Sequence, residues 1–355
     1  MRDGGPAGPS TGDTQSAAAG EGRPSSRLAV RALQRRGLDG LGAHLAQRYG
    51  IDIVGQRTLD VGVVRYDLAP GPPWVARLFP GDRPLAEAAH DERVLRALER
   101  TGFPAERCAH AEPVSLYDGQ AVLVTGFVDG QPPGRSAGTL RAFGRMLGML
   151  HARTANAGVL DFPGGAWHHL AVAGGPPGAD VDAALAALDE VEPALDPSEH
   201  SAWRAVRSLV ARSEDGAGLP EALLHPDFVP SNALWTPDRH LVLVDWTGAG
   251  RGPRLTSFGL LLWAAGARGM ADPTGMDAAV EGYRSAIELD SEEWERLAGA
   301  IVARPLLYDA WGAAVGRRAF ADVLRAAQER RSHGSAIAAH ARMAWNRRGA
   351  RPTPS

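Results

Sequence analysis

The feature that most constrains the fold of this chain is the point at which its hydrophobic pattern changes from strand to helix. Residues 51–79 show the short apolar runs of strands separated by turns, and residues 83–100 show the spacing of one helix. A further apolar run at 121–128 has the length of a strand. From Thr139 onward the pattern is helical, except for a β-rich segment at 223–246. This order predicts an α+β fold with two lobes: a small β-rich N-terminal lobe and a larger, mainly helical C-terminal lobe that contains one hairpin.

The composition allows such a fold along most of the chain. With 355 residues, of which 44% are hydrophobic and 22% charged, the sequence can bury a sizeable core. Residues 1–26 are rich in Gly, Pro, Ser and Ala, and are therefore predicted to be a disordered tail. We place the N-terminal lobe at 27–128, the C-terminal lobe at 129–345 and a short basic tail at 346–355.

The charged residues and the single cysteine exclude several classes of protein. A formal net charge of −3 provides no basic surface for nucleic acid. All 38 basic residues are arginine, so the chain has no lysine for a P-loop, a Schiff base or a nucleophile. Cys108 has no partner for a disulfide, and the longest apolar runs, such as 259–267, are too short to cross a membrane. These features predict a cytoplasmic protein.

The β-rich segment at 223–246 carries the residues that favour phosphoryl transfer. Asp227 and Asn232 have the spacing H-x-D-x-x-x-x-N, and Asp245 follows an apolar strand 13 residues after Asn232. Phosphoryl transfer needs little covalent help and much positioning of charge. Asp227 would orient the proton of the attacking hydroxyl, while Asn232 and Asp245 would each hold one Mg²⁺. The alternative is that these residues only cap a turn and close a strand, but the β-rich lobe upstream makes the combination specific.

These segments resemble the aminoglycoside phosphotransferase family over roughly residues 50–265. The resemblance rests on LLHPDFVPSNALW, LVLVDWTGAGRGPR, WVARLF with HDERVLRAL, AVLVTGFVDG and a helix ending MLGMLHA. It implies a two-lobed protein-kinase-like fold, ATP or another nucleoside triphosphate as donor, and Mg²⁺. It also implies that Asp227 is the catalytic aspartate and that Asn232 and Asp245 bind metal. The acceptors of the family include aminoglycosides, other antibiotics, choline-like alcohols, homoserine and sugars.

The resemblance further implies which residues hold the nucleotide. The basic residue on the third strand would be Arg77, paired with the phosphates and with a helix glutamate, which we expect to be Glu92 or, as a second choice, Glu87. Arginine keeps its charge and binds phosphate bidentately, although it differs from lysine in reach and hydration. The hinge, whose backbone would bond adenine, is expected at Val124, Gly126 and Val128.

Two departures from the family pattern leave alternatives open. The phosphate-covering glycine loop is reduced to Gly62, and Ser257 stands where the family usually has an aspartate that anchors the catalytic loop. A non-catalytic nucleotide-binding module on the same fold is therefore an alternative, as is a kinase of a primary metabolite such as homoserine, choline or a sugar. A third, distant alternative is a hydrolase that uses Ser136 in a G-x-S-x-G pattern, although Ser136 or Thr139 is better placed as a helix N-cap.

Charge placement gives one hint about the acceptor. Residues 155–224 hold eleven acidic residues against three arginines, and an acidic lining would favour cationic acceptors such as aminoglycosides. The alternative is a solvated helical face. Residues 304–351 show the reverse, with ten arginines against three acidic residues, which we ascribe to solubility or contacts within the protein.

Overall fold

A computed structural model describes the protein over residues 37–81, 83–154, 179–266 and 273–347. The predicted tail at 1–26 and most of the predicted tail at 346–355 lie outside these residues, as does the stretch 155–178. The lobe boundaries given above stay predictions. Among the described residues, no helix combines the length and the apolar character that a membrane crossing requires.

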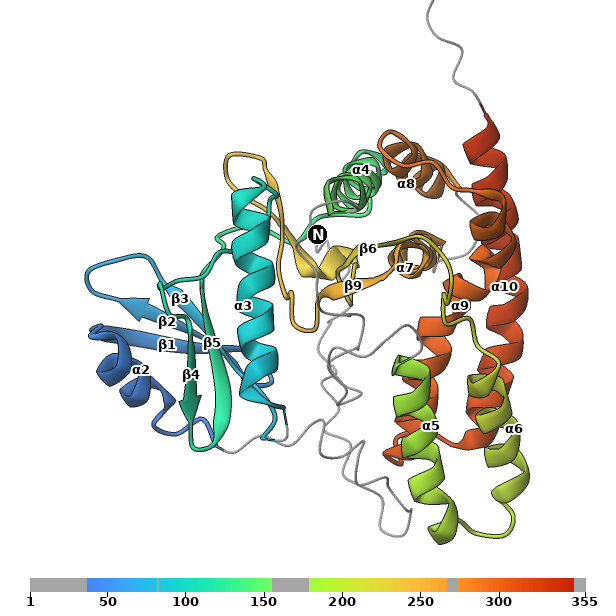
Figure 1. Cartoon of the computed structure of the whole chain (residues 1–355), viewed down its shortest axis with the longest axis horizontal. Helices are drawn as coiled ribbons and strands as arrows, with labels where there is room; N and C mark the ends of the chain where they lie inside the picture. Colours follow the sequence, from blue (N-terminus) through green and yellow to red (C-terminus); the bar gives the residue numbers. More distant parts are fainter. Residues whose placement is uncertain (1–36, 82, 155–178, 267–272, 348–355) are drawn as a thin grey trace, which may run out of the picture.

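The first part of the chain forms a five-stranded antiparallel sheet with the strand order β1-β2-β3-β5-β4, shown at the left of Figure 1. The elements of this sheet lobe are α2 (Leu41–Tyr49), β1 (Ile53–Asp60), β2 (Val63–Leu68), β3 (Trp74–Leu78), α3 (Leu85–Arg100), β4 (Val114–Tyr117) and β5 (Gln120–Gly126). The apolar run of β5 is buried on both faces because Val122 and Val124 pack with α2, whereas Ala121 and Leu123 join the core beside α3.

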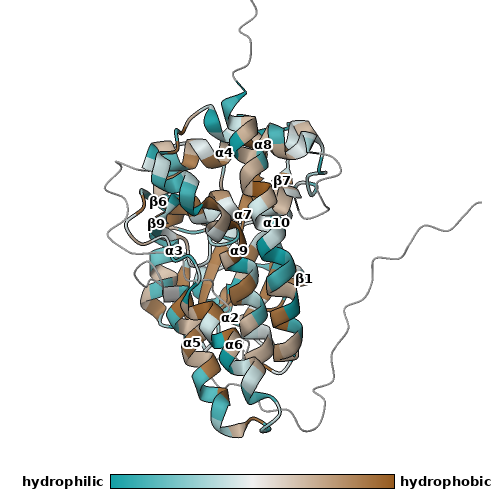
Figure 2. Cartoon of the chain, turned by 90° about the vertical axis from the view of Figure 1, so that its right-hand side faces the viewer, coloured by the Kyte–Doolittle hydropathy of each residue, from teal (hydrophilic) through white to brown (hydrophobic). Residues whose placement is uncertain are grey.

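The rest of the chain is mainly helical, as predicted. Its helices are α4 (Ala137–Thr154), α5 (Ala179–Val191), α6 (His200–Ala211), α7 (Arg254–Gly266), α8 (Thr274–Arg284), α9 (Ser291–Ala314) and α10 (Phe320–Asn346), with short 3₁₀ turns at Glu192–Ala194 and Pro230–Asn232. Figure 2 shows hydrophilic and hydrophobic segments alternating along α6 and α10, as expected for helices with one face on a core. The Ser136 hydroxyl accepts a hydrogen bond from the Thr139 N–H at 3.1 Å, so Ser136 caps α4 as expected.

The predicted β-rich segment forms two small sheets rather than one hairpin. β7 (Ala233–Trp235) pairs with β8 (Leu241–Leu243) as predicted, but β6 (Glu221–Leu224) pairs with β9 (Gly250–Pro253). The prediction missed β9 because its sequence, Gly-Arg-Gly-Pro, has the composition of a turn, and its pairing with β6 is a tertiary contact.

A continuous hydrophobic core joins the two lobes. Leu95 of α3, Phe103 and Leu123 of the sheet lobe belong to the same buried cluster as Leu243 and Trp246 of the helical lobe. The rings of Phe103 and Trp246 meet edge to face, with their centroids 5.8 Å apart. The short segment after Leu243 is thus held from both lobes at once.

Helices α4 and α8 approach each other so closely that their contact requires glycine. A Cβ added to Gly144 would lie 2.0 Å from the carbonyl oxygen of Ala279, and a Cβ added to Gly282 would lie 2.2 Å from that of Arg141. Both obstacles are backbone atoms, so a side chain at either position must push the helices apart.

We therefore expect Gly144→Ala to lower the free energy of unfolding by at least about 2 kcal/mol, because the added methyl overlaps the backbone of α8. Gly138→Ala in the same helix is the matched control, since its Cβ would lie 3.8 Å from the nearest atom. The control should leave stability unchanged or raise it by up to about 1 kcal/mol. Urea unfolding of both variants checks this, and equal stabilities would contradict the close packing.

Candidate active site

Asp227 and Asn232 lie together in the loop after β6. The side-chain amide of Asn232 donates hydrogen bonds to the backbone oxygen and to Oδ2 of Asp227, both at 2.9 Å. The 3₁₀ turn that starts at Pro230 brings Asn232 back toward Asp227. The amide nitrogen is thus committed to Asp227, and the amide oxygen is the atom through which Asn232 would bind a metal.

His225 braces this loop and has no role that requires a charge. Its Nε2 donates to the carbonyl oxygen of Val244 at 3.0 Å, and its Nδ1 accepts from the Asp227 N–H at 3.2 Å. These two bonds fit a neutral imidazole, and burial of the ring lowers the pKa of His225. Ser257, at the position where the resemblance leads us to expect an aspartate, donates to the backbone oxygen of His225 at a long 3.4 Å.

Asp245 is held in an unusual backbone conformation beside this loop. Val244 donates its N–H to the carbonyl oxygen of Asn232 at 2.8 Å, which places Asp245 next to the two other predicted residues. The φ angle of Asp245 is 67°, in the left-handed region that residues other than glycine seldom adopt. Its backbone N–H donates to Oε1 of Glu106 at 2.7 Å. Strained backbone of this kind tends to occur at functional sites.

Arg77 reaches Asp245 from the sheet lobe. On β3 it lies opposite Val63 of β2 and Leu123 of β5, and its Nη1 is 3.1 Å from Oδ1 of Asp245. Burial opposes the charge of Arg77, yet the carboxylates of Asp245, Glu106 and Asp91 hold its pKa above the ordinary value. The arginine therefore meets the predicted metal ligand directly.

The structure does not bring Glu92 to Arg77. Glu92 lies 3.8 Å from Arg96 one turn along α3, and Glu87 lies 3.2 Å from Arg83. The carboxylate of α3 that faces the site is Asp91, which is fully buried. Helical spacing explains the difference because Asp91 shares the buried face with Ala88 and Leu95, three residues before it and four after it, whereas Glu92 is turned away by about 100°. This spacing was a signal that the sequence contained.

Asp91 and its neighbour His90 tie α3 to the loop that follows Asp245. Oδ1 of Asp91 accepts from the Gly248 N–H at 3.0 Å, and Oδ2 pairs with Arg83 at 2.8 Å. Nε2 of His90 donates to the carbonyl oxygen of Ala249 at 2.9 Å. The position of Asp245 therefore depends on α3 as well as on the strand that precedes it.

Glu106 is a further site residue that the sequence analysis missed. It is buried, and its second carboxylate oxygen accepts from the Thr125 hydroxyl at 3.0 Å. Burial raises the pKa of Glu106, while the charge of Arg77 opposes that rise. No local motif marks this residue, because both of its partners are distant in the sequence.

The backbone of the predicted hinge is partly engaged within the sheet lobe. The Val124 N–H donates to the carbonyl oxygen of Pro113 at 2.9 Å, and the Val124 carbonyl oxygen accepts from the Ala109 N–H at 3.1 Å. The Gly126 N–H donates to the backbone carbonyl oxygen of Arg107 at 2.8 Å. Among the described residues, the backbone of Val128 has no such partner.

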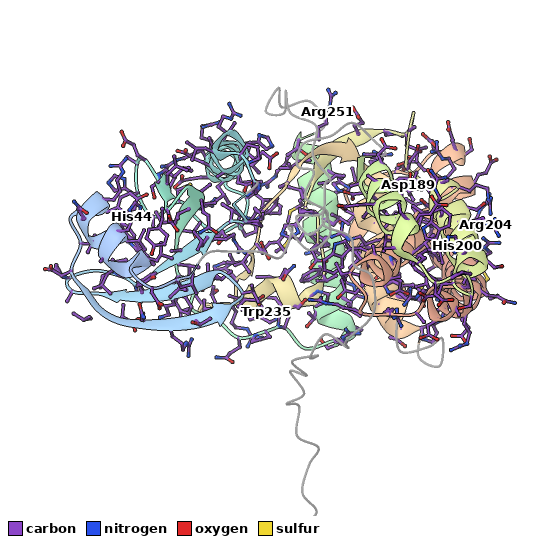
Figure 3. The ribbon with its side chains drawn as sticks, turned by 90° about the horizontal axis from the view of Figure 1, so that it is seen from below. His44, Asp189, His200, Arg204, Trp235 and Arg251 are labelled. Carbon is purple, nitrogen blue, oxygen red and sulfur yellow. The ribbon has the colours of Figure 1, made fainter. Side chains whose placement is uncertain are left out.

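A pocket of about 520 Å³ begins directly after the hinge. It is lined by Asp129, Gly130, Gln131, Trp235, Thr236, Pro237 and Arg239. Gln131 and Trp235 exchange two backbone hydrogen bonds, at 2.9 and 2.8 Å, which join the hinge segment to β7. Figure 3 shows Trp235 at the junction between the sheet lobe and the helical lobe.

The residues of the site suit a hard divalent cation bound together with a triphosphate. Asn232 and Asp245 offer an amide and a carboxylate oxygen, the ligand types that Mg²⁺ prefers. Over the described part of the chain, no group of three or more His, Cys, Asp or Glu residues could hold a metal by itself. Mg²⁺ commonly uses only one or two protein ligands alongside phosphate oxygens and water, so this small donor set fits it.

Comparison with known proteins agrees with this geometry. A family model described as the phosphotransferase enzyme family matches residues 62–300. Comparison of the sequence with curated proteins finds no match.

Three solved structures illustrate the fold. An aminoglycoside phosphotransferase from Alicyclobacillus acidocaldarius subsp. acidocaldarius DSM 446 has a TM-score of 0.54 and 18% identity, over 84% of this chain and 94% of that chain. The choline kinase LicA from Streptococcus pneumoniae has a TM-score of 0.56 and 13% identity, over 85% and 98%. The amicoumacin kinase hAmiN, in complex with AMP-PNP, Ca²⁺ and Ami, has a TM-score of 0.60 and 14% identity, over 86% and 95%. The expected protein-kinase-like fold is confirmed.

The neighbouring residues Asp91 and Glu92 give a direct test of this site. We expect Asp91→Ala to lower the free energy of unfolding by about 3–5 kcal/mol, because it removes the acceptor of the buried Gly248 N–H and one of the two carboxylates that pair with Arg83. Glu92→Ala should cost less than about 1 kcal/mol, because its pair with Arg96 is long and partly exposed. Urea unfolding of the two variants measures the difference, and a larger loss for Glu92→Ala would contradict the placement of α3.

Proposed function

The chain belongs to the phosphotransferase enzyme family, and from that premise we propose that it transfers the γ-phosphoryl group of ATP, bound with Mg²⁺, to a hydroxyl of a small molecule. The observation that carries the proposal is the meeting of Asp227, Asn232 and Asp245 with Arg77 at one place between the lobes. These are the charged and polar groups that a phosphoryl transfer requires.

Each residue has a distinct role in the proposed reaction. Asp227 orients the acceptor hydroxyl and accepts its proton, while the bond from Asn232 holds the carboxylate in place. Asn232 and Asp245 would hold the metal, and bound Mg²⁺ would neutralise charge on the phosphates. Arg77 would contact the α- and β-phosphates, a task that its bidentate guanidinium can perform in place of lysine.

The donor site combines the hinge with the loop after β8. Val128 is the hinge residue best placed to bond adenine, because the N–H groups of Val124 and Gly126 already serve the sheet. The amicoumacin kinase with a similar fold was solved with AMP-PNP and Ca²⁺, which supports a nucleotide and a divalent metal here. We therefore propose ATP as the donor and Mg²⁺ as the metal.

For the acceptor we propose an aminoglycoside-type antibiotic or a related metabolite, which would make the protein an antibiotic-resistance enzyme. A primary metabolite such as homoserine, choline or a sugar is the alternative. The acidic excess at 155–224 gives less support to a cationic acceptor than the sequence alone indicated. Within its described part, five acidic residues pair with arginines: Asp180 with Arg304, Asp189 with Arg207, Glu214 and Asp215 with Arg296, and Glu221 with Arg251.

A non-catalytic nucleotide-binding module is the second candidate. It is favoured by the reduced glycine loop at Gly62 and by the long bond from Ser257 to the catalytic loop. The complete set of Asp227, Asn232 and Asp245 favours an active kinase. Acceptor-dependent release of ADP separates the two functions.

We propose the cytoplasm as the place of action. The single cysteine, Cys108, is half buried, and burial raises its pKa to about 11. It is therefore a neutral, unreactive thiol at physiological pH. Such a residue suits a reducing compartment and has no role in the proposed reaction.

We expect Asp227→Asn to lower turnover by about a hundredfold to ten-thousandfold, because an amide cannot accept the hydroxyl proton. Affinity for the nucleotide should stay close to that of the wild type. A panel of antibiotics and hydroxylated metabolites, screened for ADP release, first identifies the acceptor and then measures the variant.

The matched control for this measurement is Asp238→Asn, which changes an exposed carboxylate in the turn between β7 and β8. This control should keep full turnover. Wild-type turnover in Asp227→Asn with the true acceptor would contradict the assigned role.

A further inference from the structure

The backbone of Asp245 requires an explanation that the predicted site residues do not provide. A non-glycine residue with a φ of 67° adopts a conformation that costs of the order of 1–3 kcal/mol, so surrounding contacts must hold it there. Its side chain meets Arg77, but that contact is available to a carboxylate in several backbone conformations. The contact that depends on the direction of the backbone is the hydrogen bond from the Asp245 N–H to Glu106.

Glu106 is itself fixed from two directions. Its own backbone N–H donates to the carbonyl oxygen of Leu243 at 3.1 Å, which attaches it to the strand that leads to Asp245. Its side chain bridges the Asp245 N–H and the Thr125 hydroxyl, through different oxygens, at 2.7 and 3.0 Å. Thr125 lies on β5 within the predicted hinge, and its side chain is buried with that of Glu106. The bridge therefore joins the hinge strand to the metal-binding loop.

We propose that Glu106 is a positioning residue that holds Asp245 in its metal-binding conformation and anchors it to the hinge strand through Thr125. This inference rests on the proposed function, because it assigns a metal to Asp245. Glu106 acts through hydrogen bonds to Asp245 and Thr125. We assign it no contact with ATP or with the small molecule that accepts the phosphoryl group.

Hydrogen bonding, rather than charge, is the property on which this role depends. A glutamine at position 106 can accept from the Asp245 N–H with its amide oxygen and donate to the Thr125 hydroxyl with its amide nitrogen. Both contacts thus survive in Glu106→Gln, although the charge is lost. Glu106→Leu keeps a similar volume and removes both contacts. Thr125→Val removes only the hydrogen bond from Thr125 to Glu106.

The test measures binding of AMP-PNP to the full-length protein by calorimetry, across a series of Mg²⁺ concentrations and without Mg²⁺. We expect Glu106→Leu to raise the Mg²⁺ concentration needed for half-maximal binding about tenfold or more, since the Asp245 N–H is left without its acceptor. Glu106→Gln should stay within about twofold of the wild type, and Thr125→Val should fall between the two. Affinity without Mg²⁺ should be the same in every variant, which a general loss of structure would not produce.

The outcomes separate this inference from the proposed function. If wild-type protein shows no Mg²⁺-dependent binding, the proposed function fails. If the wild type binds and Glu106→Leu has an unchanged Mg²⁺ requirement, the positioning role is overturned. An equal defect in Glu106→Gln and Glu106→Leu also overturns it, because charge would then be the decisive property.

If Glu106→Leu does not fold, Thr125→Val decides, and a wild-type Mg²⁺ requirement in that variant refutes the bridge. Glu112→Gln, at an exposed glutamate paired with Arg48, is the matched control and should bind as the wild type does.

Discussion

The contact on which the site depends is the ion pair between Arg77 and Asp245, whose atoms are 3.1 Å apart. Arg77 belongs to the third strand of the sheet lobe, and Asp245 to the loop after β8 in the helical lobe. The pair therefore exists only when the two lobes are correctly placed, which the shared core around Phe103 and Trp246 ensures. The proposed site needs this arrangement because the groups proposed to bind the nucleotide and those proposed to bind the metal come from different lobes.

The absence of lysine shapes the whole molecule as well as the site. Arginine keeps its charge when buried and offers several donors in one plane, so it can form ion pairs in places where lysine would lose its proton. The helical lobe uses this property repeatedly, for example where Arg254 pairs with the buried Glu293, and where Arg318 and Arg330 both pair with the buried Asp309. The arginine-rich segment near the C-terminus thus makes contacts within the protein, as the sequence analysis had allowed.

Local patterns in the sequence were enough to locate the proposed catalytic loop, whereas the residues around it were harder to find. Asp227 and Asn232 are five residues apart and meet through a short turn, so their spacing marked them as a pair, although the hydrogen bond between them was not predicted. The helix carboxylate of the site was expected at Glu92, whereas helical periodicity buries Asp91, which pairs with Arg83 and Gly248 and not with Arg77. Glu106 had no local signal, since its partners lie 19 and 139 residues away. Contacts of that range are set by the tertiary fold and cannot be read from spacing.

We propose that Asp227, Asn232, Asp245 and Arg77 converge on one metal-bound nucleotide between the lobes. A crystal structure of the full chain grown with AMP-PNP and Mg²⁺ tests it most directly. We expect Mg²⁺ at Oδ1 of Asn232 and at the carboxylate of Asp245, at about 2.1 Å, with the guanidinium of Arg77 against the phosphates. A nucleotide bound elsewhere, or a cation that contacts neither Asn232 nor Asp245, would contradict the account.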